Sequence, residues 1–281
     1  MPGTLYLCAT PIGNLGDITQ RVLDTLRGAD LIAAEDTRNS LHLLNHFDIH
    51  TPMTSYHEYN KYDKAETLLA KLKEGMDIAL ITDAGTPGIS DPGEVLVRRC
   101  LEEEVPVTSL PGPAACITAL TLSGMPTRRF CFEAFLPADK KERRQILEEL
   151  KRETRTIILY EAPHHLVKTL KELYGALGER RITLCRELTK RFETVLPTTL
   201  ASALRMYETE EPRGEYVLVL EGKDRGRIAE EQRQQYEEVS IPEHVARYEA
   251  QGMEHKEALK RVALDRGIPK REVYDAVHRS K

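Results

Sequence analysis

The first half of the chain alternates short runs of apolar and β-branched residues with amphipathic segments. The apolar runs predict strands and the amphipathic segments predict helices. This alternation is typical of a parallel sheet whose two faces are covered by helices. The predicted strands are residues 4–9, 31–34, 77–82 and 105–110, and the predicted helices are residues 19–27, 63–74 and a third that begins at Asp91-Pro92.

This rhythm breaks at Gly124-Met125-Pro126, where we place a domain boundary. Residues 130–137 predict an extended crossing segment that leads into a charged helix over 140–152. The remaining strands are predicted at 156–160, 182–187, 194–197 and 215–221, with helices at 164–177 and 200–208. The sequence therefore predicts an α/β fold of two α/β domains, residues 1–125 and 126–225.

The last part of the chain is polar and helical. Residues 226–240 are predicted to form a charged linker, and residues 241–281 a small helical domain with helices at 241–251, 256–266 and 270–279. Gly267-Ile268-Pro269 separates the last two, with glycine ending one helix and proline opening the next. A tight turn between two basic helices is the outline of a helix-turn-helix.

Composition bounds the class of protein. Apolar residues make up 41% and charged residues 30% of the chain, which is ordinary for a globular protein. No stretch approaches the roughly 20 apolar residues that span a bilayer, and the N-terminus does not fit a signal peptide. We therefore expect a cytoplasmic protein without a membrane partner. The five cysteines include no C-x-x-C pair, so neither a disulfide framework nor a metal site is predicted.

Charge is unevenly distributed along the chain. The whole chain carries a net charge of −5, so contact with nucleic acid requires a local basic patch. Residues 252–281 contain eight Lys and Arg against five acids, which gives 8 − 5 = +3. This tail either binds RNA or forms a charged cap that packs on the body or mediates dimerisation, and both alternatives stay open.

Three loops rich in glycine and proline each follow a predicted strand: residues 9–17, 82–93 and 110–115. The carboxyl ends of parallel strands meet at one edge of a sheet, where ligands bind in open α/β folds. A tight turn without a ligand remains the alternative for each loop alone. Three such loops at successive strand ends favour a binding site.

Several familiar sites are excluded by their motifs. The chain has neither the phosphate-binding G-x-x-x-x-G-K-[ST] nor G-x-G-x-x-G after the first strand, so ATP and NAD are disfavoured. Gly88-Ile89-Ser90-Asp91-Pro92-Gly93 has one residue too many for a hydrolase elbow. His42 and His46 lie one helical turn apart, as metal ligands can, but a solvated helix face is favoured because no further ligands cluster with them.

The loops together resemble a known family. The motifs are residues 9–17, Glu35-Asp36-Thr37-Arg38, Ser55-Tyr56-His57-Glu58, 83–93, Pro111-Gly112-Pro113 and Tyr160-Glu161-Ala162-Pro163-His164. They are similar to the tetrapyrrole-methylase superfamily, and more narrowly to its branch of small-subunit rRNA cytidine 2′-O-methyltransferases. The resemblance implies two α/β domains with S-adenosylmethionine in the cleft between them, a homodimer, and methylation of a cytidine ribose in the decoding region of 16S rRNA in the small ribosomal subunit.

The resemblance also implies which residues contact the cofactor. The implied contacts are Pro11, Asp83, Gly85, Thr86, Ile89, Ser90, Ala114, Ala115, Tyr160, Glu161, Ala162, Gly214, Glu215 and Tyr216. Ala114 departs from the serine expected in this branch, so its contact is reduced to the backbone.

Four residues are candidates for positioning the ribose hydroxyl or removing its proton: Glu35, Asp36, His57 and Glu58. Methyl transfer is an in-line displacement, so the protein mainly aligns the acceptor and accepts a proton. For Asp36 the alternative is that it caps the following helix and pairs with Arg38.

Two other functions remain possible from the sequence. One is a small-molecule methyltransferase that acts on a tetrapyrrole, although the helical tail and the loop at residues 35–38 argue against it. The other is a helix-turn-helix regulator whose α/β body senses S-adenosylmethionine.

Overall fold

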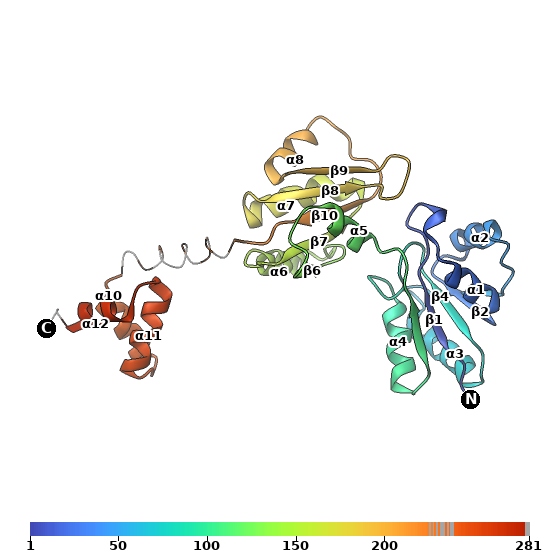
Figure 1. Ribbon diagram of the computed structural model, residues 1–281, viewed down its shortest axis with the longest axis horizontal. Helices are drawn as coiled ribbons and strands as arrows, with labels where there is room; N and C mark the ends of the chain where they lie inside the picture. The colour runs from blue at the N-terminus through green and yellow to red at the C-terminus, as the bar shows by residue number, and fades with distance from the viewer. Residues whose placement is uncertain are drawn as a thin grey trace.

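The computed structural model describes residues 1–224 and 239–278, together with residues 226, 228, 230, 234 and 236. Most of the predicted linker at 226–240 therefore lies outside the described residues. Figure 1 shows two sheets with their helices, followed by a separate group of C-terminal helices. Across the described residues, we find no helix with both the length and the apolar character of a membrane span.

The first sheet is entirely parallel, with strand order β3-β2-β4-β1-β5. All four predicted strands are confirmed, with ends shifted by at most two residues. The three-residue β3 was not predicted because it is too short to show an alternating pattern. The strands are β1 (Leu5–Cys8), β2 (Leu31–Ala34), β3 (Met53–Ser55), β4 (Ile78–Ile81) and β5 (Val107–Leu110).

Helices cover both faces of this sheet, which explains why its strands are continuously apolar. Successive residues of β4 face opposite cores: Ile78 and Leu80 pack with α3 (Lys61–Lys73) and α4 (Gly93–Glu102), while Ala79 and Ile81 pack with α1 (Gln20–Gly28) and α2 (Thr37–His46). Thr19 caps α1, as its sequence predicts, because its hydroxyl accepts a hydrogen bond from Val22 N at 3.2 Å.

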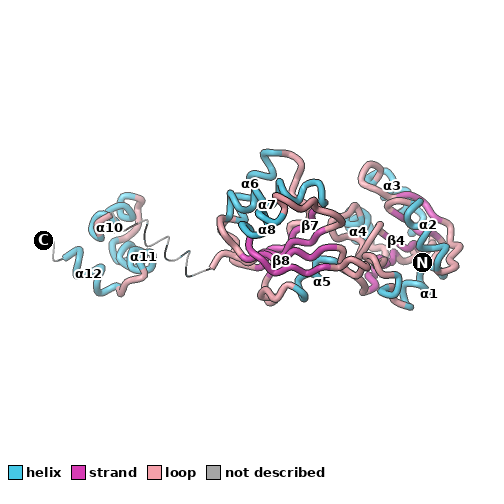
Figure 2. Tube along the Cα trace, turned by 90° about the horizontal axis from the view of Figure 1, so that it is seen from above, coloured by secondary structure: helices cyan, strands magenta, loops and turns pink. Residues whose placement is uncertain are grey.

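The second sheet is mixed, with order β6-β7-β10-β8-β9, and only β6 and β7 are parallel. Three helices pack on one face and α5 on the other (Figure 2). The predicted strands and helices of this half are confirmed. They are β7 (Thr156–Glu161), β8 (Arg181–Arg186), β9 (Thr194–Thr199), β10 (Tyr216–Leu220), α6 (Lys140–Leu150), α7 (Pro163–Leu177) and α8 (Leu200–Met206). The segment predicted as an extended crossing contains a further strand of the sheet, β6 (Phe130–Phe132).

Helix α5 (Ala115–Leu122) was not predicted, because it is apolar on nearly every side and gives no helical period. Its buried residues Cys116, Ala119 and Leu120 pack against β7 and β10 of the second sheet. It does so although it precedes the boundary predicted at residue 125. The chain thus crosses between the two sheets immediately after the loop that follows β5.

The C-terminal helices enclose an apolar core of their own. Val245, Leu259, Val262 and Val273 are buried in it. Gly267 ends the second of these helices in the left-handed conformation, with φ of 61°, as the sequence predicts. The helices are α10 (Ile241–Ala250), α11 (His255–Arg266) and α12 (Lys270–His278), and with them the predicted fold class is confirmed.

The close approach of the β1 and β5 loops gives a test of this packing. A Cβ atom added to Gly112 would lie 2.6 Å from the Cβ of Ala9. We expect Gly112→Ala to lower the free energy of unfolding by about 1–3 kcal/mol, because Ala9 is fully buried and cannot move aside. The double variant with Ala9→Gly removes the clash. Urea denaturation of wild type, the two single variants and the double variant should therefore show a double variant that is more stable than the sum of the two single changes predicts. Strict additivity of the two changes would contradict this packing.

Candidate active site

The loops that follow β1 and β4 are joined by backbone hydrogen bonds. Thr10 N donates to Gly85 O at 2.9 Å, and Gly85 N donates to Thr10 O at 3.0 Å. The loop after β5 is tied to them because Thr86 Oγ1 donates to Pro113 O at 2.9 Å. The three loops therefore converge on one sheet edge, as predicted, and form a continuous wall.

Asp91 holds the loop after β4 in shape. Its carboxylate accepts hydrogen bonds from the backbone N of Gly88 at 2.8 and 3.0 Å, of Ile89 at 3.2 Å and of Gly93 at 2.8 Å. The predicted cap of α4 is wrong by one residue, because the N-cap is Pro92 and the helix begins at Gly93; Asp91 lies just before the cap and still accepts from the first helical N–H. Within the loop, Ser90 adopts a positive φ of 65°, which is uncommon for a residue other than glycine.

Aromatic rings form the facing wall from the second domain. The Tyr160 ring lies edge-on to Phe132 at 4.9 Å and to Phe135 at 5.6 Å between centroids. Its hydroxyl accepts a hydrogen bond from Cys116 N at 3.2 Å, which fixes the ring against the start of α5. Burial raises the pKa of Tyr160, so the phenol is neutral at physiological pH.

A network of charged side chains borders the end of β8. The Lys190 ammonium lies 3.0 Å from Glu187 Oε1 and 2.8 Å from Glu215 Oε2. Gly214 has a positive φ of 75°, and a Cβ there would lie 2.5 Å from Glu187 Cγ. Gly214 therefore allows the close approach that lets Glu215 N donate to Glu187 Oε1 at 2.9 Å.

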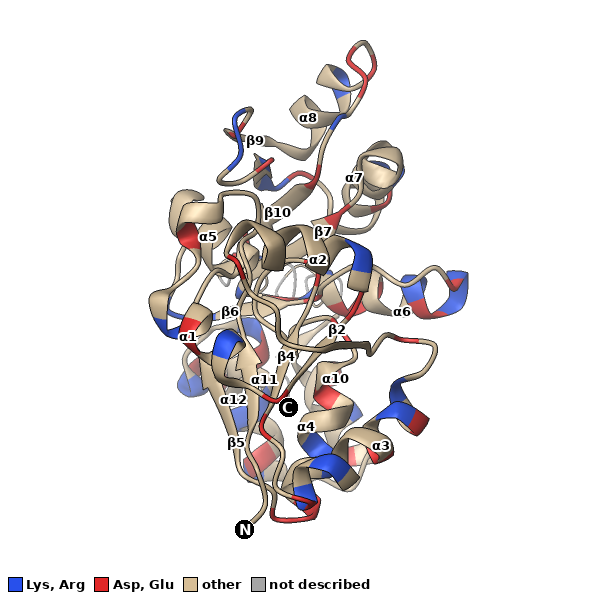
Figure 3. Cartoon of the chain, turned by 90° about the vertical axis from the view of Figure 1, so that its right-hand side faces the viewer, with Lys and Arg blue, Asp and Glu red and all other residues tan. Residues whose placement is uncertain are grey.

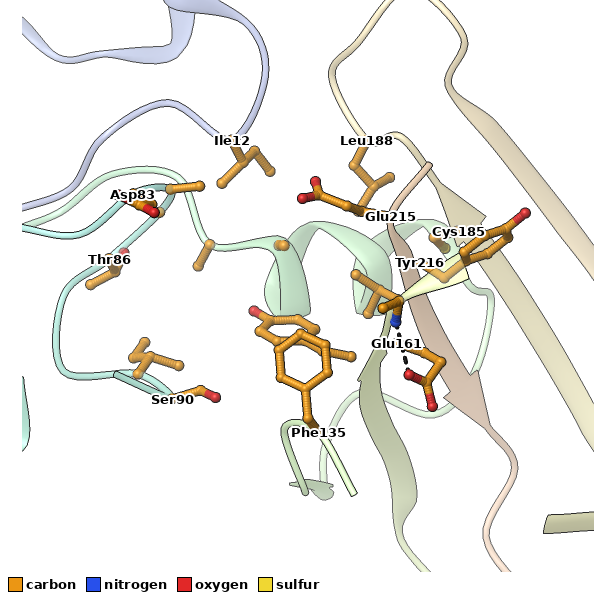
Figure 4. Close-up of a pocket in the computed structure, with 18 of the residues that line it drawn as sticks. Ile12, Asp83, Thr86, Ser90, Phe135, Glu161, Cys185, Leu188, Glu215 and Tyr216 are labelled. Atoms are coloured by element: carbon orange, nitrogen blue, oxygen red, sulfur yellow. Dashed lines mark hydrogen bonds between the residues drawn. The ribbon is translucent and has the colours of Figure 1, made fainter. Parts of the chain in front are cut away.

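These walls enclose a cavity of about 450 Å³, part of which Figure 4 shows in close-up. Residues from both sheets contribute to it, so neither half of the chain forms it alone. Its lining consists of Ile12, Glu35, Asp83, Ala84, Gly85, Thr86, Ile89, Ser90, Ala114, Ala115, Phe135, Tyr160, Glu161, Ala162, Cys185, Leu188, Lys190, Glu215, Tyr216 and Val217.

Twelve of the fourteen residues predicted to contact a cofactor line this cavity. The two outside it are Pro11, which borders a neighbouring cavity, and Gly214, which packs against Glu187. The twelve are Asp83, Gly85, Thr86, Ile89, Ser90, Ala114, Ala115, Tyr160, Glu161, Ala162, Glu215 and Tyr216.

Seven lining residues were not predicted, and most of them are apolar: Ile12, Ala84, Phe135, Cys185, Leu188, Lys190 and Val217. Ile12 and Ala84 lie inside two of the predicted loops, so their position in the chain was a usable signal. Phe135 is 54% exposed at the end of an extended segment, and an exposed aromatic residue there carries no pattern of its own.

Glu35 is the one predicted catalytic residue that lines the cavity. Its Oε2 accepts a hydrogen bond from Thr82 Oγ1 at 2.5 Å, at the end of β4. Asp83 lies beside it, held by Asp36 N at 3.2 Å and by the Asn39 amide at 3.4 Å. Burial, reinforced by the charge of Glu35, raises the pKa of Asp83. Two carboxyl groups therefore meet where the neighbouring strands β2 and β4 end.

Asp36 has a different environment. It caps α2 by accepting from Arg38 N at 2.8 Å, and its carboxylate pairs with the Arg38 guanidinium at 2.8 Å. The hydrogen bonds from Arg38 lower the pKa of Asp36 to about 2, which makes it a poor proton acceptor. The structure thus bears out the alternative interpretation of Asp36 as a cap and ion-pair partner.

His57 and Glu58 lie outside the cavity lining. His57 N donates to Asn60 Oδ1 at 2.8 Å, in the turn that starts α3. Glu58 Oε1 pairs with Lys61 Nζ at 2.5 Å. The geometry therefore gives both residues local roles at the start of this helix and does not bring them to Glu35.

Comparison with known proteins identifies the fold family. A model of the family described as Tetrapyrrole (Corrin/Porphyrin) Methylases matches residues 4–204, which include the first sheet and all strands of the second sheet except β10. The chain belongs to this family. The resemblance noted in the sequence is thereby confirmed, and so is S-adenosylmethionine as the methyl donor of the enzyme.

Three relatives are similar over nearly the whole chain, and each is named "Ribosomal RNA small subunit methyltransferase I". The protein of Halalkalibacterium halodurans is 49% identical over 98% of this chain and 95% of its own length. That of Synechocystis is 46% identical over 97% of this chain and 96% of its own length. That of Bacillus subtilis is 45% identical over 98% of this chain and 94% of its own length.

Solved structures share the fold at much lower identity. A uroporphyrin-III-C-methyltransferase from Thermus thermophilus aligns with a TM-score of 0.56 and 19% identity, covering 81% of this chain and 98% of that one. A diphthine synthase aligns with a TM-score of 0.61 and 14% identity, covering 79% and 90%. At these identities the likeness establishes the architecture of the methylase family and nothing about substrate.

The cavity suits the methyl donor of the family. Its volume of about 450 Å³ falls within the range of roughly 300–1,000 Å³ found for small-molecule sites. The small side chains of Ala114 and Ala115 leave room beside the loop after β4, and the ring of Tyr160 offers a flat apolar surface. Backbone groups of Gly85 to Ser90 can meet the polar ends of the cofactor. The residues that line the cavity therefore fit S-adenosylmethionine.

The role of Asp91 can be separated from simple helix capping. We expect Asp91→Ala to weaken S-adenosylmethionine binding roughly tenfold by calorimetry, because Ile89 and Ser90 lose their support. It should also lower the free energy of unfolding by about 0.5–2 kcal/mol. The matched control is Asp139→Ala, because Asp139 caps α6 and does not line the cavity. Equal loss of cofactor affinity in both variants would contradict this role.

Asp83 makes stability depend on pH. Because its pKa is raised above the ordinary 3.8, its contribution to the free energy of unfolding is greatest below that value and is lost as the pH rises through the raised pKa. We expect Asp83→Asn, which does not ionise, to be more stable than wild type at neutral pH. The difference should shrink as the pH falls to about 4. Urea denaturation measures it, and an equal change at both pH values would be inconsistent with a raised pKa.

Proposed function

We propose that the enzyme methylates the ribose 2′-oxygen of a cytidine in the decoding region of 16S ribosomal RNA. The observation that carries this proposal is sequence identity of 45–49%, over 97–98% of the chain, with proteins named as rRNA small subunit methyltransferases. The similarity extends beyond the methylase domains into the C-terminal helices. From the family resemblance we also propose a homodimer.

The residues that line the cavity are assigned different roles in methyl transfer. When bound, S-adenosylmethionine supplies an electrophilic methyl group on a sulfonium that is a good leaving group. Glu35 and Asp83 supply carboxyl groups where the acceptor must enter, so we assign them to orienting the ribose hydroxyl and to Glu35 the acceptance of its proton. Ile12, Leu188 and Phe135 present apolar surface that excludes water from the reacting groups.

The distribution of charge bears on how RNA is held. In Figure 3, α3 and α6 carry both acidic and basic side chains, so these helices do not form a surface of one sign. Residues 252–281 carry a net charge of +3, but Lys260 pairs with Glu257 at 2.6 Å and Arg261 with Asp265 at 3.3 Å. Part of the tail's positive charge is therefore neutralised within it, which leaves a moderate electrostatic attraction to phosphates.

Two rival functions fit the comparisons less well. Tetrapyrrole methylation rests on the description of the family as a whole and on solved structures at 19–20% identity, which share the fold. A regulator that senses S-adenosylmethionine has no counterpart among the relatives at 45–49% identity, which are named as methyltransferases. The RNA substrate is therefore the better-supported proposal.

The direct experiment incubates purified protein and methyl-labelled S-adenosylmethionine with small ribosomal subunits that lack the modification. We expect label on one nucleotide, at the 2′-oxygen. Label on a base would refute the ribose assignment, and label on a tetrapyrrole but not on subunits would favour the small-molecule alternative.

Glu35 provides a sharper test of the chemistry. We expect Glu35→Gln to lower kcat roughly 100-fold, because the amide still accepts from Thr82 but accepts no proton from the ribose. Cofactor affinity should change little. The matched control is Glu94→Gln, an exposed carboxylate on α4 that pairs with Arg98 at 3.5 Å. An unchanged kcat in Glu35→Gln would show that Glu35 does not accept the proton.

A further inference from the structure

A second cavity of about 350 Å³ lies between the loop after β1 and helix α2. It borders the active-site cavity, because Asp83 lines both. Nothing in the proposed mechanism so far uses it. Its lining consists of Thr10, Pro11, Gly13, Leu15, Asn39, His42, Leu43, His46 and Asp83.

Helix α2 contributes one stripe of side chains to this cavity. Asn39, His42, Leu43 and His46 follow the spacing i, i+3, i+4 and i+7, which places them on one face of the helix. The opposite face is anchored, since Leu44 is buried in the core of the first domain. The histidine pair noted in the sequence is therefore held toward the cavity by the packing of the helix.

These histidines do not form a metal centre. Among the residues that the structure describes, no group of three or more His, Cys, Asp and Glu side chains is arranged to hold a metal ion. Their imidazoles and the Asn39 amide instead offer hydrogen-bond donors and acceptors beside the Asp83 carboxyl group, which lines the same cavity.

The opposite wall of the cavity is apolar. Pro11 and Leu15 belong to it, while Leu43 adds an apolar side chain to the wall formed by α2. Leu15 is 42% exposed. It is held in place by a 3₁₀ helix (Leu15–Asp17, η1), whose cap residue Asn14 accepts a hydrogen bond from Gly16 N at 3.0 Å. A fixed apolar surface opposite polar side chains is what an unstacked nucleobase requires, with its face in contact and its edge hydrogen-bonded.

The connection to the active site follows from the structure of a nucleotide. The carbon that bears the 2′-hydroxyl is bonded directly to the carbon that bears the base, so the base of the methylated nucleotide must lie beside the methyl-transfer site. Asp83 separates the two cavities and is contacted by the Asn39 amide at 3.4 Å. The hydrogen-bonded pair of Thr10 and Gly85 joins their walls.

We propose that this second cavity binds the nucleobase of the nucleotide that is methylated, and that Asn39, His42 and His46 recognise its edge. The inference rests on the proposed function, because it requires a nucleotide acceptor. It assigns base recognition to α2 and leaves proton transfer to Glu35.

The test uses the full-length protein with His42→Ala and His46→Ala combined. Both side chains are exposed, so the fold should persist. We expect kcat/KM for unmodified small subunits to fall about 10- to 100-fold, the range that lost base-edge contacts give, while calorimetric affinity for S-adenosylmethionine stays unchanged. The matched control is His50→Ala, an exposed histidine that follows α2 and pairs with Asp48 at 2.9 Å. It should behave as wild type.

A second measurement separates recognition from general damage. After the labelled nucleotide is mapped, subunits carrying uridine in its place are compared with the natural ones. Wild type should prefer the natural base, and the double variant should lose most of that preference. If wild type labels a 2′-oxygen but the variant keeps both efficiency and preference, this inference fails and the proposed function stands. If wild type labels no ribose, both fail.

Discussion

Parallel strands end at the same edge of a sheet, and in this protein the loops at that edge are bonded to one another. The strand order places β1 between β4 and β5, so the loops after these three strands are neighbours before any ligand arrives. Thr10 and Gly85 then pair through their backbones, and Thr86 reaches Pro113. This hydrogen-bonded edge supports the loop that Asp91 shapes, the carboxyl pair of Glu35 and Asp83, and the walls of both cavities.

The second sheet completes what this edge begins. Helix α5 starts directly after the third loop and packs on the second sheet, so the crossing point of the chain is itself part of the cavity wall. Tyr160 is fixed there by Cys116 N, and Glu161 is buried beside it with bonds from Thr169 and Ala162 N. Because each half supplies part of the lining, cofactor binding is expected to stabilise the two halves together.

Features that cost stability gather at the active site. Ser90 adopts a positive φ, and Asp83 is held next to a second carboxyl group with a raised pKa. Such arrangements persist when surrounding contacts over-determine them, as the four hydrogen bonds to Asp91 and the backbone bridge at Gly85 do here. Across the cavity, Gly214 has no side chain and so allows the Glu187 side chain to approach its backbone.

The sequence by itself determined the α/β class, nearly every strand, the helix caps at Thr19 and Gly267, and the convergence of the three loops, because these follow from local periodicity and turn chemistry. It also carried the family motifs, so twelve residues of the cavity lining were identified before the fold was known. The short strand β3 and the uniformly apolar helix α5 were not predicted, because neither shows a hydrophobic period.

Only the tertiary structure decided which charged groups meet. Glu35, Asp36, His57 and Glu58 look alike as candidates in the chain, yet packing brings only Glu35 of these four into the cavity lining, while Asp36 pairs with its near neighbour Arg38. The same holds for His42 and His46, whose direction depends on which face of α2 is buried. Side-chain neighbours separated by some forty residues depend on strand order and helix orientation, and local sequence does not encode these distances.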